Sequence, residues 1–192
     1  MISNISKAAL AFAATGLGGC MTMAPMAAVG SNAIAYVGGA AMYPTKNIIE
    51  NAVNSPEHTT LVAAVKAAGL VDTLSGPGPF TVFAPTNAAF AKLPAGTVET
   101  LLRPENKAAL QSVLTYHVVA GRITAADLMA MISAGGGQAL LTTVQGGRLV
   151  ARMQGNRIIL IDAKGRTSHV TQANVIQSNG VIHVTDAVSL PG

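Results

Sequence analysis

Two largely apolar segments, far apart in the chain, limit its fold more than any other feature. The first is Gly78-Pro79-Phe80-Thr81-Val82-Phe83-Ala84-Pro85-Thr86-Asn87-Ala88-Ala89-Phe90. The second is Asn179-Gly180-Val181-Ile182-His183-Val184-Thr185-Asp186-Ala187-Val188. Short apolar runs next to Gly, Pro or Asn are typical of buried strands. Each segment is therefore predicted to contain a buried strand.

The stretch Leu114-Thr115-Tyr116-His117-Val118-Val119 lies between these two segments. Together the three stretches resemble the two signature boxes and the central Tyr-His pair of the fasciclin domain, an extracellular adhesion and interaction module. The resemblance covers about residues 47–191, as a single unit without tandem repeats. It implies an α+β fold, in which N-terminal helices pack on a mostly antiparallel β-sheet wedge or sandwich. It also implies that the strands of the two signature segments join one common sheet.

The composition suits one domain with an aliphatic core. Of the 192 residues, 50% are hydrophobic and 10% are charged, and there is no Trp. A chain of this length usually forms one domain with short extensions. The formal net charge is only +4, without the dense basic stripe that nonspecific nucleic-acid binding requires. We therefore expect no nucleic-acid partner.

The N-terminus has the pattern of an export signal over residues 1–19. Lys7 precedes a mostly apolar stretch from Ala8 to Gly18, too short for a membrane span, which needs about 20 apolar residues. Leu17-Gly18-Gly19-Cys20 resembles a bacterial lipobox, which implies a lipid-anchored Cys20. A lone cysteine in an exported protein favours this interpretation, because it has no disulfide partner. The alternative is an ordinary secretory signal cut later, after Ala33-Ile34-Ala35.

Residues 20–46 are rich in Ala, Gly, Met and Pro and almost free of charge. They are predicted to form the lipidated Cys and a flexible tether before the domain. The mature protein is then expected to be lipid-anchored at the cell surface, or in the outer membrane or periplasm. If the cell is Gram-negative, the outer membrane is favoured, because Met21 stands where lipoproteins retained in the inner membrane have Asp. If the lipobox is not used, the protein is secreted.

The first half of the domain has helical periodicity and the second half has strand periodicity. Helices are predicted at 47–53, 59–68, 97–102, 107–118 and 124–132, and a helix after Thr86 contains Ala88, Phe90 and Leu93. Thr86 is its predicted N-cap, and Asn87 stands where the family often has an acid. Strands are predicted at 80–84, 139–143, 148–153, 157–162, 168–176 and 181–188.

Tyr116 and His117 are candidate contact residues, because a Tyr-His stretch is implicated in integrin-dependent adhesion by some animal fasciclin proteins. The structural alternative, which we favour, packs the Tyr116 ring at the end of an amphipathic helix, where its hydroxyl finds a partner. His183 is predicted to be buried and hydrogen-bonded to backbone. Asp186 is predicted to accept backbone amides at a corner of the sheet.

The sequence carries no catalytic constellation. It lacks a Gly-x-Ser-x-Gly elbow and a phosphate-binding loop, and its one thiol is the expected lipid anchor. His117, His169 and His183 have none of the tight spacings of a zinc site. We therefore expect neither an enzyme, nor a cofactor, nor a metal.

Basic residues gather in the strand-rich half. Alternation along 148–153 places Arg148, Val150 and Arg152 on one face, and Arg157 follows in the next strand. This face is a candidate for contact with anionic glycan or lipid phosphate. The alternative is an ordinary solvated face, since outward strand positions often carry Lys or Arg.

The sequence therefore predicts an extracytoplasmic, membrane-anchored adhesion or interaction module that binds an envelope or extracellular protein or a carbohydrate. The alternative function is a periplasmic carrier of a small ligand or lipid. A carrier requires an apolar cavity of roughly several hundred Å³ between the helices and the sheet.

Overall fold

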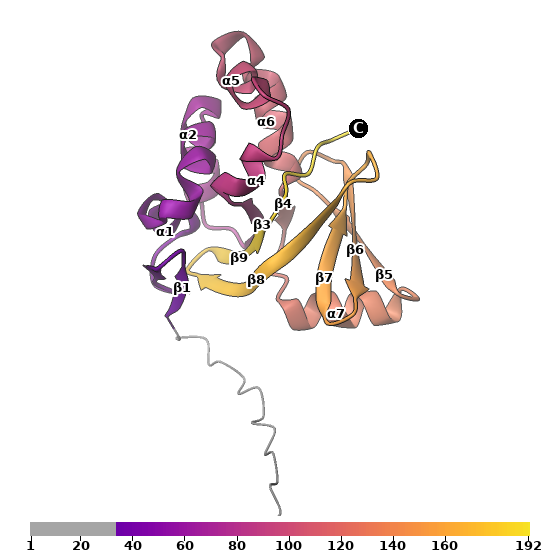
Figure 1. Ribbon diagram of the computed structural model, residues 1–192. Helices are drawn as coiled ribbons and strands as arrows, with labels where there is room; N and C mark the ends of the chain where they lie inside the picture. Colours follow the sequence, from indigo (N-terminus) through magenta and orange to yellow (C-terminus); the bar gives the residue numbers. More distant parts are fainter. Residues whose placement is uncertain (1–33) are drawn as a thin grey trace, which may run out of the picture.

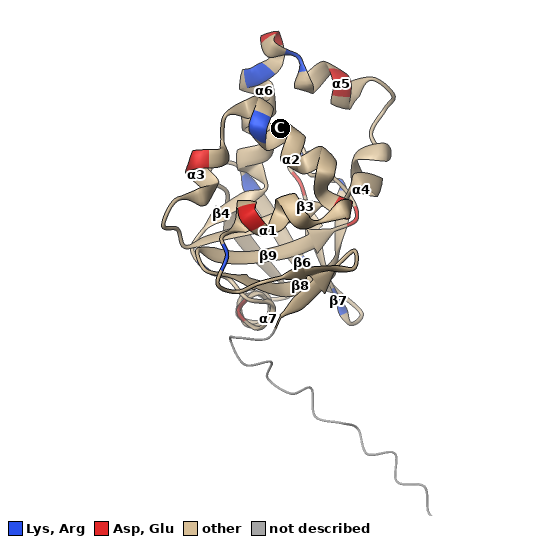
Figure 2. Ribbon diagram, turned by 90° about the vertical axis from the view of Figure 1, so that its left-hand side faces the viewer, with Lys and Arg blue, Asp and Glu red and all other residues tan. Residues whose placement is uncertain are grey.

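The computed structural model describes residues 34–192, so the predicted signal peptide, Cys20 and most of the predicted tether lie outside the described residues. The N-terminal helices stand over one side of a curved sheet, and the C-terminal strands extend away from them (Figure 1). The view turned by 90° shows the same two layers, with α1 and α2 above the strands and α7 at the opposite end (Figure 2). This is the predicted α+β architecture.

Helices form where apolar periodicity and capping residues coincide. Asn47 and Thr124 each start a helix with a capping box, and Thr86 caps a third helix through its side-chain oxygen. The helices are α1 (Ile48–Asn54), α2 (Thr59–Ala68), α3 (Val71–Ser75), α4 (Asn87–Ala91), α5 (Thr97–Leu102), α6 (Lys107–Tyr116) and α7 (Ala125–Ala134), with 3-10 turns η1 (Pro56–His58) and η2 (Pro104–Asn106). None of these described helices is long and apolar enough to cross a membrane.

Seven strands form one sheet in the order β4-β3-β9-β8-β7-β6-β5. They are β3 (Phe80–Pro85), β4 (Val118–Ala120), β5 (Gln138–Thr142), β6 (Arg148–Gln154), β7 (Arg157–Ile161), β8 (Thr167–Gln177) and β9 (Gly180–Thr185). Only the β3–β9 pairing is parallel in this sheet. An isolated bridge between Val119 and Thr143 joins the two ends. The sheet is therefore a nearly closed wedge, and "sandwich" describes it only loosely.

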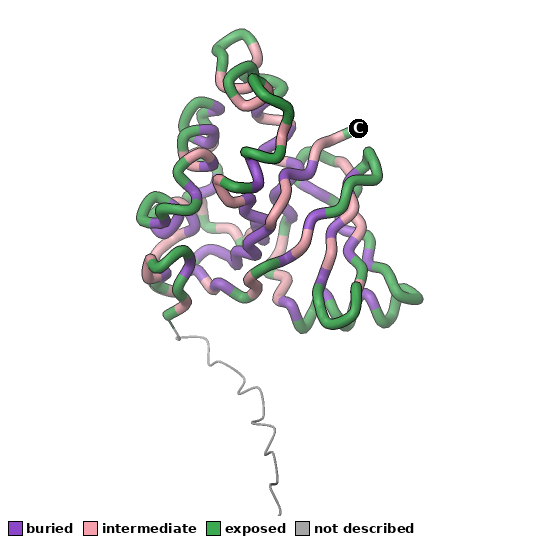
Figure 3. The backbone as a smooth tube through the Cα atoms, in the orientation of Figure 1, coloured by how far each residue is buried: buried purple, intermediate pink, exposed green. Residues whose placement is uncertain are grey.

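Two hydrophobic clusters fill the molecule, and both are visible as purple segments in Figure 3. The first lies between the helices and β3 and β9, and includes Leu61, Val65 and Leu114. The second lies between α7 and strands β5–β8, and includes Leu128 and Leu160, each with no exposed surface. The core is mainly aliphatic, as the composition predicts, and Phe83, Phe90 and Tyr116 are its buried aromatic residues.

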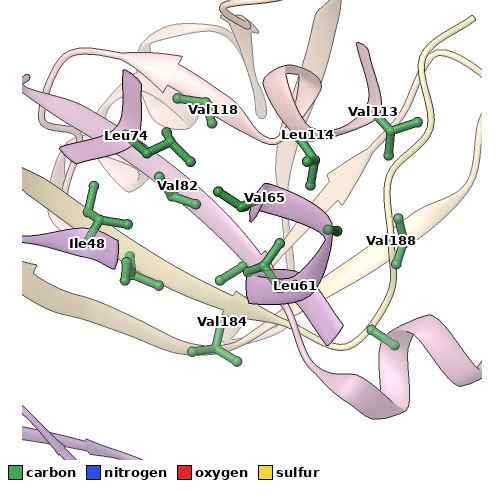
Figure 4. Close-up of a cluster of buried hydrophobic side chains, with 14 of the residues drawn as sticks. Ile48, Leu61, Val65, Leu74, Val82, Val113, Leu114, Val118, Val184 and Val188 are labelled. Atoms are coloured by element: carbon green, nitrogen blue, oxygen red, sulfur yellow. The ribbon is translucent and has the colours of Figure 1, made fainter. Parts of the chain in front are cut away.

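The two signature segments lie side by side, as predicted. β3 pairs with β9 in parallel, so that Val82 faces Ile182 and Ala84 faces Val184. Val82 and Val184 belong to one cluster with Leu61 and Val65 of α2 packed over them (Figure 4). The non-local pairing that the resemblance implies is therefore confirmed.

The domain begins earlier than residue 47. A two-stranded hairpin, β1 (Ala35–Val37) and β2 (Ala40–Met42), occupies part of the segment predicted as a flexible tether. Val37 and Met42 are each only 2% exposed in the first cluster. The Asn51 side chain holds Tyr43 at both its backbone N–H (2.9 Å) and its carbonyl (2.8 Å). The tether prediction is therefore wrong for the hairpin residues, because their apolar side chains complete the core.

Most predicted boundaries differ little from the observed ones, and two differences have clear causes. The helix predicted to continue to Val118 ends at Tyr116, because Val118 starts β4 and pairs with Val82. The last strand ends at Thr185 instead of Val188, because the Asp186 backbone N–H donates to the carbonyl of His169 and the chain turns away.

Candidate interaction surface

Strand alternation gives β5, β6 and β7 one inward and one outward set of side chains. Leu149, Ala151 and Leu160 point inward and have no exposed surface. The outward set is the basic sheet face, made of Gln138, Leu140, Thr142, Arg148, Val150, Arg152, Gln154, Arg157, Ile159 and Ile161. The predicted common face of Arg148, Val150 and Arg152 is therefore confirmed.

The cross-strand register places the arginines among uncharged neighbours. Arg152 lies between Gln138 of β5 and Ile159 of β7, and its Nη2 donates to the side-chain oxygen of Gln138 at 2.6 Å. Arg148 faces Thr142, and Arg157 faces Gln154. All three arginines are exposed at the surface.

No carboxylate neutralises the basic sheet face in the part of the chain that the structure describes. Asp162, the one acid in this part of the sequence, is buried. It accepts the backbone N–H groups of Lys164, Arg166 and Leu190 at 2.9 Å each, and pairs with Arg166 Nε at 3.1 Å. Arg166 is thereby engaged, while Arg148, Arg152 and Arg157 remain available to an external anion.

Tyr116 and His117 are both buried, and their side chains bond to the backbone of other segments. The Tyr116 side chain is wholly buried, and its hydroxyl donates to the Arg148 carbonyl (2.6 Å) and accepts from the Ala163 N–H (3.0 Å). His117 is 3% exposed; Nδ1 contacts the Val113 carbonyl at 2.8 Å and Nε2 accepts from the Ser189 N–H at 3.0 Å. A surface role for this pair is therefore wrong for this conformation, because both rings are enclosed.

His183 is buried and bonded to backbone, as predicted. Its Nε2 lies 2.8 Å from the Ile123 carbonyl, and its ring stacks on Phe83 with centroids 5.6 Å apart. Burial lowers the pKa of His183, which the carbonyl of Ile123 only partly offsets. The ring is therefore a neutral packing element that tethers the Ile123 backbone to β9.

Asp186 lies at the end of β9 and accepts the His169 backbone N–H at 2.8 Å, as predicted for a sheet corner. Lys92 Nζ approaches the same carboxylate at 3.5 Å, and His169 Nδ1 approaches it at 3.3 Å. Burial alone would raise the pKa of Asp186, but the hydrogen bond from His169 and the charges of Lys92 and His169 outweigh it and lower the pKa.

Thr86 caps α4, and Asn87 joins α4 to α2 and η1. Thr86 Oγ1 accepts from the Ala89 N–H at 3.3 Å, as predicted for an N-cap. The Asn87 amide accepts from the Thr60 N–H at 3.0 Å and donates to the Pro56 carbonyl at 2.9 Å. Asn87 therefore has a local bridging role that an acid could fill only in part, since a carboxylate cannot donate.

The three histidines considered as metal ligands bond to different groups. His117 contacts Val113 and Ser189, His183 contacts Ile123, and His169 contacts Asp186 and Gln154. Within residues 34–192, no group of three or more His, Cys, Asp or Glu side chains gathers to hold a metal ion.

A narrow apolar cavity lies where the carrier alternative requires one, between α1–α3 and strands β3 and β9. Its volume is about 40 Å³, and its lining includes Ile48, Leu61, Val82 and Ile182. This volume is far below the several hundred Å³ expected for a carrier of small ligands. The geometry gives the carrier alternative no support.

Two features of the surface went unrecognised in the sequence. One is the burial of the Asp162 side chain, which the sequence indicates only through the turn-like run Asp162-Ala163-Lys164-Gly165. The other is the outward side of α7, where Met129 and Met131 are 44% and 38% exposed. Periodicity identifies the buried Leu128 and Ile132, but does not reveal that apolar residues also face outward.

Comparison with known proteins agrees with this architecture. The Fasciclin domain family model matches residues 56–191. Protein sll1483 of Synechocystis is 49% identical over 158 residues, which is 82% of this chain and 80% of that protein. The cell surface glycolipoprotein MPB83 of Mycobacterium bovis is 50% identical over 76 residues, 37% of this chain and 33% of that protein.

A solved structure shares the fold. The FAS1 domain pair of the insect cell adhesion molecule fasciclin I superposes with a TM-score of 0.67 at 21% identity, over 76% of this chain and 51% of that one. The family match, the relative that aligns over most of the chain and the common fold agree with each other. The chain belongs to the fasciclin-domain family.

Proposed function

We propose that this chain is an extracytoplasmic, membrane-anchored interaction module that binds an anionic glycan through the basic sheet face. Fasciclin domains occur in cell-adhesion and extracellular proteins, which supports the general class. The observation that carries the specific proposal is the presence of three exposed arginines without a carboxylate partner among the described residues: Arg148, Arg152 and Arg157.

The chemistry of the basic sheet face suits a repeating anion. Arg148 and Arg152 lie on one strand at a four-residue separation, which corresponds to about 13 Å. A guanidinium group binds carboxylate or sulfate oxygens through paired N–H donors. Leu140 is 54% exposed between these charges, where it would pack against the apolar C–H faces of sugar rings.

Anchoring through Cys20 is part of the same proposal. Its support is the lipobox-like Leu17-Gly18-Gly19-Cys20 and the absence of a second cysteine. The similar M. bovis protein is named a cell surface glycolipoprotein. Growth with labelled palmitate should label the wild-type chain and leave Cys20→Ser unlabelled. An unlabelled wild-type protein would refute the anchor and leave the glycan proposal unaffected.

Binding to immobilised heparin and polygalacturonate, as sulfated and carboxylated probes, tests the basic sheet face. The triple variant R148Q/R152Q/R157Q should lose at least about tenfold in affinity, and wild-type binding should weaken with added salt because ions screen exposed charges.

The matched control is K66Q/R103Q/K107Q, which removes the same charge from exposed positions on the helical layer. It should retain nearly all binding. Equal losses in the two triple variants would show an effect of net charge alone and would overturn the proposed site. Salt-independent binding, or none, would overturn the proposal as well.

A further inference from the structure

Helix α7 exposes an apolar side that has no cover among the described residues. Its buried side contains Ala125, Leu128 and Ile132. Its exposed positions are Ala126, Asp127, Met129, Ala130, Met131, Ser133 and Ala134. A surface helix normally presents charged and polar residues to water, yet Asp127 is the single charge in this set.

The apolar side of α7 continues onto the sheet. A shallow hollow of about 490 Å³ lies between the end of α7 and the start of β5, lined by Met131, Ala134, Gly135, Gln138, Ala139 and Leu140. Leu140 is 54% exposed there. We name the set Ala126, Met129, Ala130, Met131 and Ala134 the α7 face, and Leu140 of the basic sheet face lies across the hollow from it.

The α7 face lies at the end of the molecule where the described chain begins. Figures 1 and 2, at right angles to each other, both show α7 and the first described residues at the lower end. Cys20 precedes Ile34 by 14 residues, which span at most about 50 Å when extended. A lipid on Cys20 would therefore hold this end of the domain within reach of the bilayer.

The charges beside the α7 face favour an anionic surface. Arg152 bonds Gln138 at the rim of the hollow, and Arg122, exposed just before the helix, donates through Nη2 to the carbonyls of Gln177 (3.1 Å) and Ser178 (3.4 Å) while keeping its charge. The Asp127 carboxylate accepts the backbone N–H and the hydroxyl of Thr124 through Oδ2 at 2.8 Å each, and it sets one negative charge against the two arginines. Exposed apolar side chains flanked by Arg are the pattern of proteins that rest on a membrane interface.

We propose that the α7 face docks on an anionic lipid bilayer, with Met129 and Met131 entering the headgroup region. Methionine suits this contact because its unbranched thioether chain adapts to an irregular surface. This orientation sends α5 and α6 outward and keeps the basic sheet face to one side of the membrane contact. The inference rests on the proposed display at a membrane, but its test does not use the lipid on Cys20.

The experiment is vesicle flotation of residues 20–192, the mature chain that the lipobox implies, carrying Cys20→Ser, with vesicles of 30% phosphatidylglycerol in phosphatidylcholine. The double variant M129Q/M131Q keeps side-chain length and helix propensity but removes the apolar contact. Its partition coefficient should be at least about tenfold below that of the parent chain. The matched control V53Q/V144Q removes two exposed apolar side chains from other parts of the surface, and should partition like the parent.

A second measurement reports on the α7 face directly. Vesicles should protect Met129 and Met131 from oxidation by hydrogen peroxide, measured by peptide mass spectrometry, with the half-buried Met153 of β6 as reference. Equal flotation of parent and M129Q/M131Q, together with unchanged oxidation, would overturn the proposal. Protection that depends on protein concentration and not on vesicles would also overturn it, in favour of contact between two copies of the chain.

Discussion

The hydroxyl of Tyr116 donates to the carbonyl oxygen of Arg148 at 2.6 Å, and this hydrogen bond ties the end of α6 to the first residue of β6. The same hydroxyl accepts from the Ala163 N–H at 3.0 Å. One buried group thus joins the helical layer to the strand that carries the basic sheet face. Tyr116 is therefore not part of the basic sheet face, but its hydrogen bond holds β6, which carries that face, in place.

Tyr116→Phe should destabilise the domain while preserving its packing. The change leaves the Arg148 carbonyl and the Ala163 N–H without their partner, and an unsatisfied buried polar group costs about 1–3 kcal/mol. Urea denaturation should show a lower midpoint with an unchanged slope. An unaltered midpoint would mean that water replaces the lost hydroxyl and that the bond contributes little.

The stability of the domain should decrease as the pH falls from 7 to 5. Burial lowers the pKa of His58, His117 and His183, so the folded protein keeps these rings neutral. The unfolded chain takes up protons below about pH 6.5, and each histidine then costs up to about 1.4 kcal/mol per pH unit. Urea titrations at pH 8, 7, 6 and 5 should show a plateau above pH 7 and a decline below it. Constant stability down to pH 5 would contradict the prediction.

Gly180→Ala should be among the most damaging single changes. A Cβ at this position would overlap the carbonyl oxygen of Phe80, with which Gly180 is paired in the parallel β3–β9 register. Rigid backbone cannot move aside, so we expect a loss of about 3 kcal/mol or more in the free energy of unfolding. Gly155→Ala provides the comparison, because its Cβ would meet open space at a φ of 59° and should cost only about 1–2 kcal/mol.

The hairpin before residue 47 should contribute to stability. Met42→Ala removes a side chain that is 2% exposed in the first cluster, and a buried Met→Ala change costs about 2–5 kcal/mol. Tyr36→Ala, on the same hairpin but 63% exposed, should change the free energy of unfolding by less than about 0.5 kcal/mol. If Met42→Ala lowers the melting temperature as little as Tyr36→Ala does, the hairpin is not part of the cooperative domain.

The sequence predicts those parts of the fold in which side-chain pattern and local geometry agree. Arg148, Val150 and Arg152 alternate with Leu149 and Ala151, so period-two spacing alone assigns them to opposite faces. Thr86 precedes an apolar helix and has the side chain that an N-cap needs. The parallel partner of β3 is different, because periodicity does not say which strands meet; only the resemblance to the family supplies that pairing.

The features that could not be predicted depend on contacts with distant parts of the chain. Val37 and Met42 lie among Ala and Gly without a clear period, and only the neighbouring cluster gives these short strands their stability. Met129 and Met131 are ordinary helix residues in the sequence, and their exposure follows from the position of α7 at one end of the wedge. His117 is a polar residue at a helix end, and its enclosure depends on the distant Ser189.

The parallel pairing of β3 with β9 has a consequence for folding during synthesis. β3 pairs with β9 from Phe80 with Gly180 onward, so each residue of β3 precedes its partner by 100 residues (180 − 80). Contacts between such distant segments form late, because a long loop must first close. A chain still emerging from the ribosome therefore lacks the element that locks its sheet. The sheet cannot close between β3 and β8 until β9 has been synthesised.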